Sequence, residues 1–363
     1  MATVTPMDFM ASGYVLPMKV SKPEVQNISI ASADTISDIT LPQVGFAGAL
    51  RLNVTASGGV GSSVFAADAP FNLLTSIRQS FPNENKTSTT LDDIDGYSLY
   101  LLNLLDTIGA VNIGNINYSL DTSNGNFSFS VLLPRWVSYA TGVGVVGVNG
   151  SSQAPQLSLG INAASNIYTT LPTTLPTVNI ELVYEYVQAP AAVSAFNVPQ
   201  TQVPPYNGTI VTRGVQAQSL GGNGYVHFTT QGGLIRNWVL VMRDSSGARE
   251  SLSGNFPDSL LITDNGNNTL DRIYLNDHLE WQEYALQNIN IPTGVLFLPY
   301  SRDIFGRASQ YTMGQQWRRT SAESFITATG SWPSSGNLQV ITDMVSPALP
   351  AGTSLQNFFM ALA

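Results

Sequence analysis

The stretch Gly48-Ala49-Leu50-Arg51-Leu52-Asn53-Val54 alternates apolar and polar side chains with a period of two. Its leucines and valine fall on one side of an extended chain, and its arginine and asparagine fall on the other, which is the pattern of a half-buried β-strand. The chain continues with Pro-Phe-Asn-Leu-Leu at 70–74, an Asn-rich turn and Thr-Leu-Asp-Asp-Ile at 90–94. The last segment predicts the start of a helix, with Thr90 as its N-cap and Asp92 and Asp93 in its first turn.

The second half of the chain repeats this order of segments. An apolar strand pattern begins at 232–234, Pro-Asp-Ser-Leu-Leu follows at 257–261, and an Asn-rich turn leads into a second expected helix at 269–273. Farther on, the apolar segment that ends at Pro134 is matched by one that ends at Pro299. Such self-similarity indicates two copies of one domain.

Further alternating segments at 127–133, 178–186 and 338–344 predict more strands, and the continuously apolar stretch Trp238–Met242 predicts a strand covered on both faces. Many short strands, Gly-rich turns and few helix signals are typical of sandwiches and jelly rolls. We therefore predict an all-β fold of two tandem eight-stranded jelly rolls, with about one short helix in each.

The domain boundary is expected at a proline-rich segment, because proline removes a ladder donor and stiffens the chain. We predict an N-terminal arm at 1–20, a first roll at 21–189, a linker at 190–207 and a second roll at 208–363. Three polar stretches, 57–69, 112–126 and 141–155, are expected to be exposed loops.

The composition excludes several classes of function. Hydrophobic residues make up 43% of the chain and charged residues only 11%, less than half the usual share of about 25%. The net charge is −9 and there is no cysteine, so direct nucleic-acid binding, disulfides and thiolate metal sites are not expected. No signal peptide is predicted, and the apolar stretch 7–18 is too short to span a bilayer.

The sequence offers little for catalysis. A GxGxxG pattern at Gly142, Gly144 and Gly147 leads into polar, Gly-rich chain rather than a helix, so we interpret it as a loop and not a dinucleotide site. His227 falls in a predicted strand and His278 in a predicted helix, with neither a GxSxG elbow nor metal-ligand spacing nearby. Both histidines are expected to be structural.

Carboxylates cluster at Asp92, Asp93 and Asp95, and again at Asp264 and Asp271. Paired acids perform glycoside hydrolysis, but a helix start explains the first cluster and a polar turn the second. We expect no enzyme activity, no cofactor and no metal.

A series of segments, taken in chain order, resembles a family of double jelly-roll major capsid proteins. These proteins belong to tectivirus-like bacterial viruses that have an internal membrane, in the adenovirus/tectivirus capsid lineage. The resemblance covers most of residues 20–350. The segments 48–56, 70–74 and 129–139 are similar to strands of that family's first roll, and 268–271 and 293–303 to its second. The arm departs from the family in being short and rich in methionine.

The resemblance implies a homotrimer with a pseudo-hexagonal outline that tiles an icosahedral shell around an internal lipid membrane. Its implied partners are neighbouring capsomers, penton and minor membrane-linked proteins, and the inner membrane, without direct nucleic-acid contact. Its implied location is the virion capsid, after synthesis and assembly in the host cytoplasm. The candidates for membrane or assembly contact lie in the arm and just after it: Met7, Phe9, Met10, Tyr14, Lys19 and Lys22.

A second interpretation is a carbohydrate- or receptor-binding β-sandwich, such as a viral spike or lectin-like module. Such a protein needs an aromatic platform, which the stretch from Trp136 to Tyr139 offers. The same two side chains also suit packing between subunits or under a loop. A glycosidase on a β-sandwich is the third interpretation.

Overall fold

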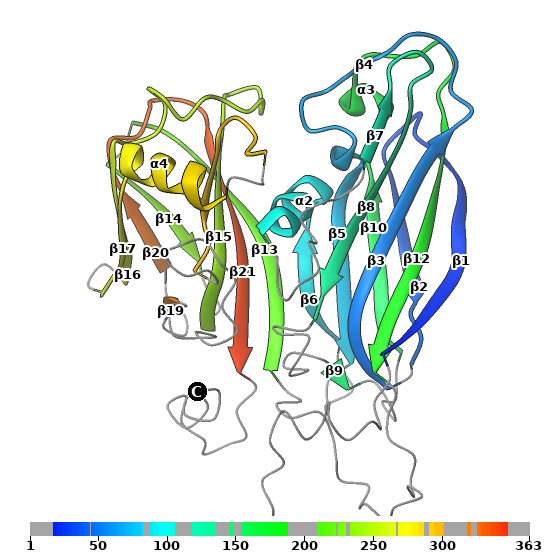
Figure 1. Cartoon of the computed structure of the whole chain (residues 1–363), viewed down its shortest axis with the longest axis horizontal. Coiled ribbons are helices and arrows are strands. Elements are labelled where there is room, and N and C mark those ends of the chain that lie inside the picture. Colours follow the sequence, from blue (N-terminus) through cyan, green and yellow to red (C-terminus); the bar gives the residue numbers. More distant parts are fainter. Residues whose placement is uncertain are drawn as a thin grey trace, which may run out of the picture. The chain divides into compact units, whose positions relative to one another are not determined.

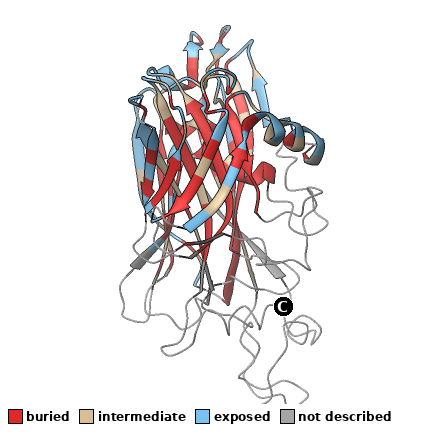
Figure 2. Cartoon of the chain, turned by 90° about the vertical axis from the view of Figure 1, so that its left-hand side faces the viewer, coloured by how far each residue is buried: buried red, intermediate tan, exposed pale blue. Residues whose placement is uncertain are grey.

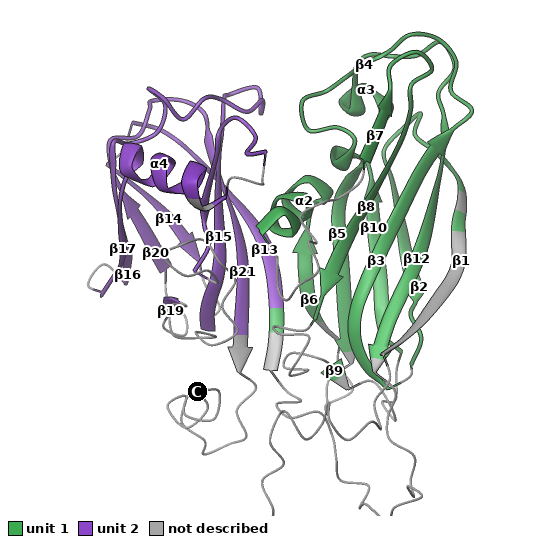
Figure 3. Cartoon of the chain, in the orientation of Figure 1, with its two compact units in different colours: residues 1–211 green, residues 212–363 purple. Residues whose placement is uncertain are grey.

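The computed structural model of the chain (Figure 1) describes residues 17–43, 45–82, 88–105, 118–135, 146–147, 154–187, 209–222, 224–229, 233–265, 268–286, 290–300, 318–320 and 325–347. The chain divides into two compact units, Met1–Val211 and Thr212–Ala363 (Figure 3). The predicted proline linker lies between strands β12 and β13, and its residues 190–207 fall outside the described ones.

The first unit contains two antiparallel sheets. One has the order β1-β12-β3-β8-β7, with the short β9 beside β3. Its strands are β1 (Pro17–Ser29), β12 (Thr177–Val187), β3 (Phe46–Ser57), β8 (Asn126–Pro134), β7 (Tyr118–Asp121) and β9 (Val146–Gly147). The other has the order β2-β10-β5-β6, built from β2 (Asp34–Thr40), β10 (Gln156–Ile161), β5 (Leu74–Pro82) and β6 (Ser88–Ile94). The predicted inward positions Leu50, Leu52 and Val54 are each about 1% exposed or less, so the core lies where the alternation placed it.

The second unit repeats the arrangement. Its first sheet runs β13-β21-β15-β18, with the short β19 beside β15, and comprises β13 (Thr209–Ser219), β21 (Asn337–Pro347), β15 (Gly233–Arg243), β18 (Val295–Leu298) and β19 (Arg318–Thr320). Its second sheet runs β14-β20-β16-β17, from β14 (Tyr225–Thr229), β20 (Phe325–Thr329), β16 (Ser259–Asp264) and β17 (Asn268–Tyr274). Residues 234–242 of β15 are all buried, which confirms the prediction of a strand covered on both faces.

The two units share one topology. In chain order, β1, β2, β3, β5, β6, β8, β10 and β12 of the first unit correspond to β13, β14, β15, β16, β17, β18, β20 and β21 of the second. In each unit the first strand pairs with the last, and these eight strands divide into two sets of four, one in each sheet, which is the connectivity of a jelly roll. The predicted fold class, two tandem eight-stranded jelly rolls, is confirmed.

The predicted helix starts are wrong by about six residues in both rolls. Thr90 to Ile94 belongs to strand β6, and Thr269 to Ile273 belongs to β17. The helices follow these strands, as α2 (Gly96–Leu105) and α4 (Leu275–Ala285); the first roll also has the short η1 (Phe71–Leu73) and α3 (Ala164–Ile167).

The N-cap of α2 is Asp95. Its carboxylate accepts hydrogen bonds from the Ser98 amide at 2.8 Å and the Ser98 hydroxyl at 2.6 Å, which is the task that the sequence assigned to Thr90. The acidic cluster of the first roll therefore contains two residues at the end of strand β6, Asp92 and Asp93, and the N-cap of helix α2, Asp95.

The polar stretch 57–69 is not a loose loop. The Ser63 amide donates to the Thr122 carbonyl, and the short strand β4 (Val64–Phe65) pairs with β11 (Tyr168–Thr170). Gly125, with φ +70°, lies directly against Pro172, so a side chain there would clash. The tip of the first roll is thus a hydrogen-bonded cluster of loops.

Candidate functional site

The predicted arm residues are only partly within the described chain. Met7, Phe9, Met10 and Tyr14 lie outside the described residues. Lys19 and Lys22 belong to strand β1, where they pair in register with Glu185 and Leu182 of β12. The strand begins at Pro17, so the last residues assigned to the arm are part of a sheet.

The three carboxylates of the first cluster have separate structural partners. Asp92 is buried and forms an ion pair with buried Arg135, whereas Asp93 forms an exposed pair with Arg78 at 3.1 Å. Asp95 caps α2. Since the three side chains serve different partners, they do not form the paired acids that glycoside hydrolysis needs.

Arg135 is held on several sides. Its guanidinium donates to the Gln79 side-chain oxygen at 2.7 Å and to the carbonyl of Val211, the last residue of the first unit, at 2.8 Å. A buried charge needs such partners, because desolvation costs several kcal/mol per ion. The signal for this site is an arginine that directly follows the apolar strand β8.

The second roll has its own buried charge cluster. Asp343 on β21 accepts from Arg236 on β15 at 2.7 Å and from the Asn237 side chain at 3.1 Å, and Arg213 on β13 lies 3.7 Å away. All four side chains are 4% exposed or less. Sequence reasoning missed this cluster, although an arginine inside the apolar run 233–243 signals it.

Helix α2 binds the backbone of β8 through one side chain. The Asn103 amide group donates to the Leu132 carbonyl at 2.8 Å and accepts from the Leu132 N–H at 2.9 Å. Both residues are buried. We call this contact the Asn103 clip.

Helix α4 makes the same contact with two side chains. Gln282 accepts from the Phe297 N–H on β18 at 2.8 Å, and His278 donates from Nε2 to the Phe297 carbonyl at 2.7 Å. Burial lowers the pKa of His278, which its contacts with the Phe297 carbonyl and Asp271 partly oppose. The prediction that His278 is structural agrees with this Gln282–His278 clip.

His227 lies on the outer side of sheet β14-β20-β16-β17. It is exposed, and its Nδ1 is 3.0 Å from the Thr327 hydroxyl on the neighbouring strand. Its ring is 4.7 Å from the ring of Tyr225 and 5.3 Å from that of Phe325. Tyr225 and Phe325 are 52% and 46% exposed, so this sheet presents aromatic rings outward.

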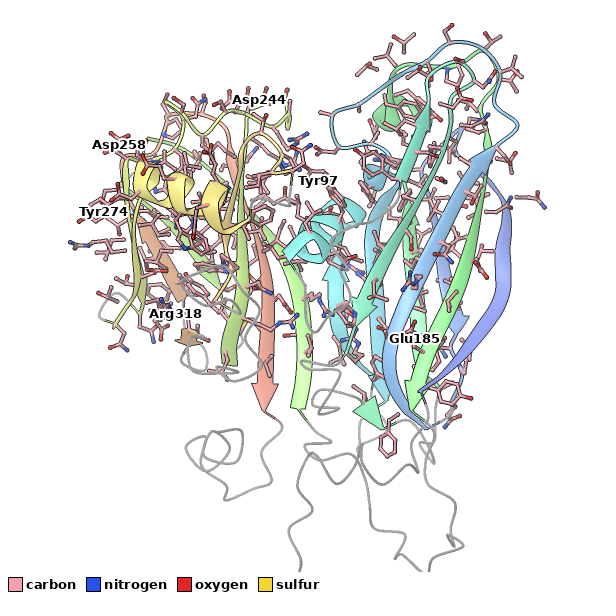
Figure 4. The ribbon with its side chains drawn as sticks, viewed as in Figure 1. Tyr97, Glu185, Asp244, Asp258, Tyr274 and Arg318 are labelled. Atoms are coloured by element: carbon pink, nitrogen blue, oxygen red, sulfur yellow. The ribbon has the colours of Figure 1, made fainter. Side chains whose placement is uncertain are left out.

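The outward positions of these four strands form a continuous surface, which we call the aromatic face. Figure 2 turns toward the viewer the side on which β16 and β17 lie in Figure 1, and Tyr274 at the end of β17 is labelled in Figure 4. Strand register places the following residues on this face: Tyr225, His227, Thr229, Thr329, Thr327, Phe325, Ser259, Leu261, Thr263, Thr269, Arg272 and Tyr274. The aromatic positions were not predicted; their signal is Tyr and Phe at the outward positions of alternating strands.

The corresponding sheet of the first roll has a different outer side, which we call the polar face. Its outward residues are Thr35, Thr40, Gln156, Ser158, Ser76, Arg78, Ser80, Thr90 and Asp93. Arg78 and Asp93 are 60% and 54% exposed. No aromatic residue stands among these positions.

Within the described part of the chain, the remaining candidates form no catalytic or metal site. Gly147 pairs with Phe46 as part of β9, whereas Gly142, Gly144, Trp136 and Tyr139 fall outside the described residues. Where the chain is described, no group of three or more metal-ligating side chains comes together. The described helices are all too short or too polar to cross a bilayer.

The sequence matches no protein-family model and no curated protein. Its structure is similar to that of the major capsid protein of STIV, with a TM-score of 0.58 and 12% identity over 92% of this chain and 97% of that chain. A chain in the atomic structure of Sulfolobus turreted icosahedral virus gives a TM-score of 0.61 and 13% identity over 93% and 94%. A chain of the PBCV-1 virus capsid gives 0.51 and 11% over 92% and 94%.

These neighbours share the double jelly-roll fold with this chain along nearly its whole length. They are capsid proteins of an archaeal and an algal virus rather than enzymes. At 11–13% identity the likeness shows the fold.

Proposed function

We propose that this chain is a viral major capsid protein. The observation that carries the proposal is the match of both rolls, in one chain and over 92% of its length, with a viral major capsid protein. The low share of charged residues, 11%, also supports it, because wide lateral contacts then desolvate few ions. The proposed role is structural and involves no enzyme activity, cofactor or metal.

In this proposal the assembling unit is a homotrimer. Three copies with two rolls each give six similar sandwiches, and hence a pseudo-hexagonal outline that suits closed, repeating contacts. Such capsomers would tile an icosahedral shell around an internal lipid membrane in the virion, after synthesis in the host cytoplasm. Penton and minor membrane-linked proteins are the further partners, and nucleic acid is not a direct one.

We also propose that the N-terminal arm faces the membrane or a partner protein. Its sequence is apolar between Met7 and Met18, with basic residues following at Lys19 and Lys22. Because β1 begins at Pro17, a truncation should stop at residue 16. Deleting 1–16 is expected to leave a folded trimer that no longer floats with anionic lipid vesicles, whereas unfolding of the truncated chain would contradict the assignment.

The decisive test of the proposed function is the solution mass of the purified protein by light scattering, with negative-stain images of the same sample. We expect a mass of three times 38.9 kDa and a hexagonal outline. A monomer at all concentrations would reject the capsomer.

A further inference from the structure

The aromatic face has almost no charged side chains and several exposed aromatic ones. Among its twelve outward positions only Arg272 is charged, while Tyr225, Phe325 and Tyr274 are each about half exposed. Scattered exposed apolar side chains are normal, but a contiguous group on one sheet marks an interaction site. The same positions of the first roll carry the exposed Arg78–Asp93 pair and no ring.

From this contrast we infer that the aromatic face is a subunit interface that binds a second copy of this chain. The inference deepens the proposed function and rests on it. Aromatic side chains are enriched, and charges depleted, at the centre of protein–protein interfaces. Tyr225, His227 and Phe325 form such an aromatic cluster on β14 and β20, and the threonines of β14, β20 and β16 lie beside it.

Charge favours a second copy as the occupant. The partner of an uncharged face must itself have few charges, and this chain has only 11% charged residues. Arg272, the single charge among these positions, is positive and exposed, and each copy carries 24 acidic against 15 basic residues. A cation at the margin of an uncharged patch therefore meets a surface of opposite net charge.

Ring geometry disfavours a sugar as the occupant. A saccharide stacks on flat, accessible ring faces, but here the Tyr225 and His227 rings are inclined by 44° and the His227 and Phe325 rings by 82°. The first pair of rings is tilted and the second stands edge to face, so the three rings form a ridged surface. Such a surface suits contact with protein side chains, because aromatic rings prefer offset or edge-to-face partners and Tyr is enriched at protein interfaces.

Interface contacts of this type join different surfaces of neighbouring copies. A closed trimer uses heterologous contacts, in which one patch meets another patch of the next subunit. The aromatic face supplies one side of such a contact. Because the polar face of the first roll differs so strongly from it, an added charge should weaken association on the aromatic face and leave association unchanged on the polar face.

The experiment introduces one negative charge at matched places. Phe325→Glu and Tyr225→Glu place it on the aromatic face, and Thr35→Glu places it on β2, the counterpart of β14, where Thr35 is exposed. Light scattering over a concentration series gives the association constant of each variant. We expect each aromatic-face variant to associate at least about 30-fold more weakly, as for interface residues that dominate binding, and Thr35→Glu to associate like the unmodified chain.

The outcomes separate this inference from the proposed function. An unmodified chain that is monomeric rejects the capsomer itself. An oligomer that Phe325→Glu and Tyr225→Glu leave intact overturns only the interface. The chain is also tested on a glycan array. If it binds a sugar there, and Tyr225→Glu abolishes that binding without changing the oligomer, the aromatic face binds carbohydrate instead.

A second measurement guards against misfolding of the variants. A photoreactive benzoylphenylalanine at position 325 should form a covalent dimer of the chain on irradiation, and the same group at position 35 should not. Circular dichroism and thermal unfolding of the Glu variants should match those of the Thr35→Glu control. Equal cross-linking at both positions would contradict the inference.

Discussion

The Asn103 clip and the Gln282–His278 clip serve the same purpose with different side chains. Leu132 and Phe297 each stand two residues before a proline, Pro134 or Pro299. The N–H of each residue donates a hydrogen bond to a helix side chain, and its carbonyl accepts one from a helix side chain. An unpaired strand edge is a template for misassociation, and each clip occupies such main-chain groups.

The difference between the clips shows what the two rolls have in common and what they do not. The first roll uses one neutral amide for both bonds, so that clip does not titrate. The second roll divides the task between an amide and an imidazole, which makes the contact sensitive to pH. In both rolls the N–H and the carbonyl of one strand residue are hydrogen-bonded to a helix, but different side chains form the bonds.

The largest loss of stability is expected from substitutions at the apolar inward positions, which both rolls have. Leu52→Asp puts an unpaired carboxylate at a site with no exposed surface. We expect the first roll to unfold, with a loss of about 5 kcal/mol or more, measured by denaturant unfolding. Thr55→Asp, at an exposed outward position of the same strand, should change stability by less than about 0.5 kcal/mol. Similar losses in both variants would contradict the register of β3.

The Asn103 clip should give the next largest effect. Asn103→Leu removes both bonds to Leu132 and leaves a buried N–H and a buried carbonyl without them. Each such group costs about 1–3 kcal/mol, so we expect a loss of about 3 kcal/mol in chemical denaturation. A loss below about 1 kcal/mol would show that the clip contributes little.

Gln282→Leu should cost less than the change at Asn103. It removes only the bond to the Phe297 N–H, while His278 keeps the carbonyl. A loss of about 1–2 kcal/mol is expected by the same measurement. An effect equal to that of Asn103→Leu would show that His278 does not hold the Phe297 carbonyl independently of Gln282.

The sequence predicted the features that depend on alternation and repetition. Leu50, Leu52 and Val54 lie in the core as their spacing requires, and the repeated order of segments is the repeated jelly roll. Alternation predicts which face is buried, because it follows from strand geometry alone.

The helix starts and the polar contacts depend on partners that are distant in sequence. Thr90 and Asp95 both suit an N-cap, and pairing of β6 with β5 decides between them. Asn103 stands alone in an apolar run, but its partner is 29 residues away. The aromatic face was missed because outward aromatic positions were not separated from inward ones.

The smallest effect distinguishes the two clips by pH. The pKa of His278 lies below its ordinary value of 6.5 in the folded chain because the ring is largely buried. As pH falls through 6.5, the unfolded chain therefore binds the proton first, and stability declines until the pH reaches the lower, folded-state pKa. Above pH 6.5 this contribution is fully present.

His278→Gln removes the titrating ring and keeps a side-chain amide that donates to the Phe297 carbonyl. Its stability should lose this slope between pH 6.5 and the folded-state pKa, on the order of 1.4 kcal/mol for each unit by which the two pKa values differ. Denaturant unfolding at pH 8 and at pH 5 measures the difference. Asn103→Gln in the first roll is the matched control, since it alters a clip that carries no proton and should keep the slope of the unmodified chain. If His278→Gln retains that slope as well, the acid sensitivity of the second roll lies in another group, and the two clips differ in composition without differing in behaviour.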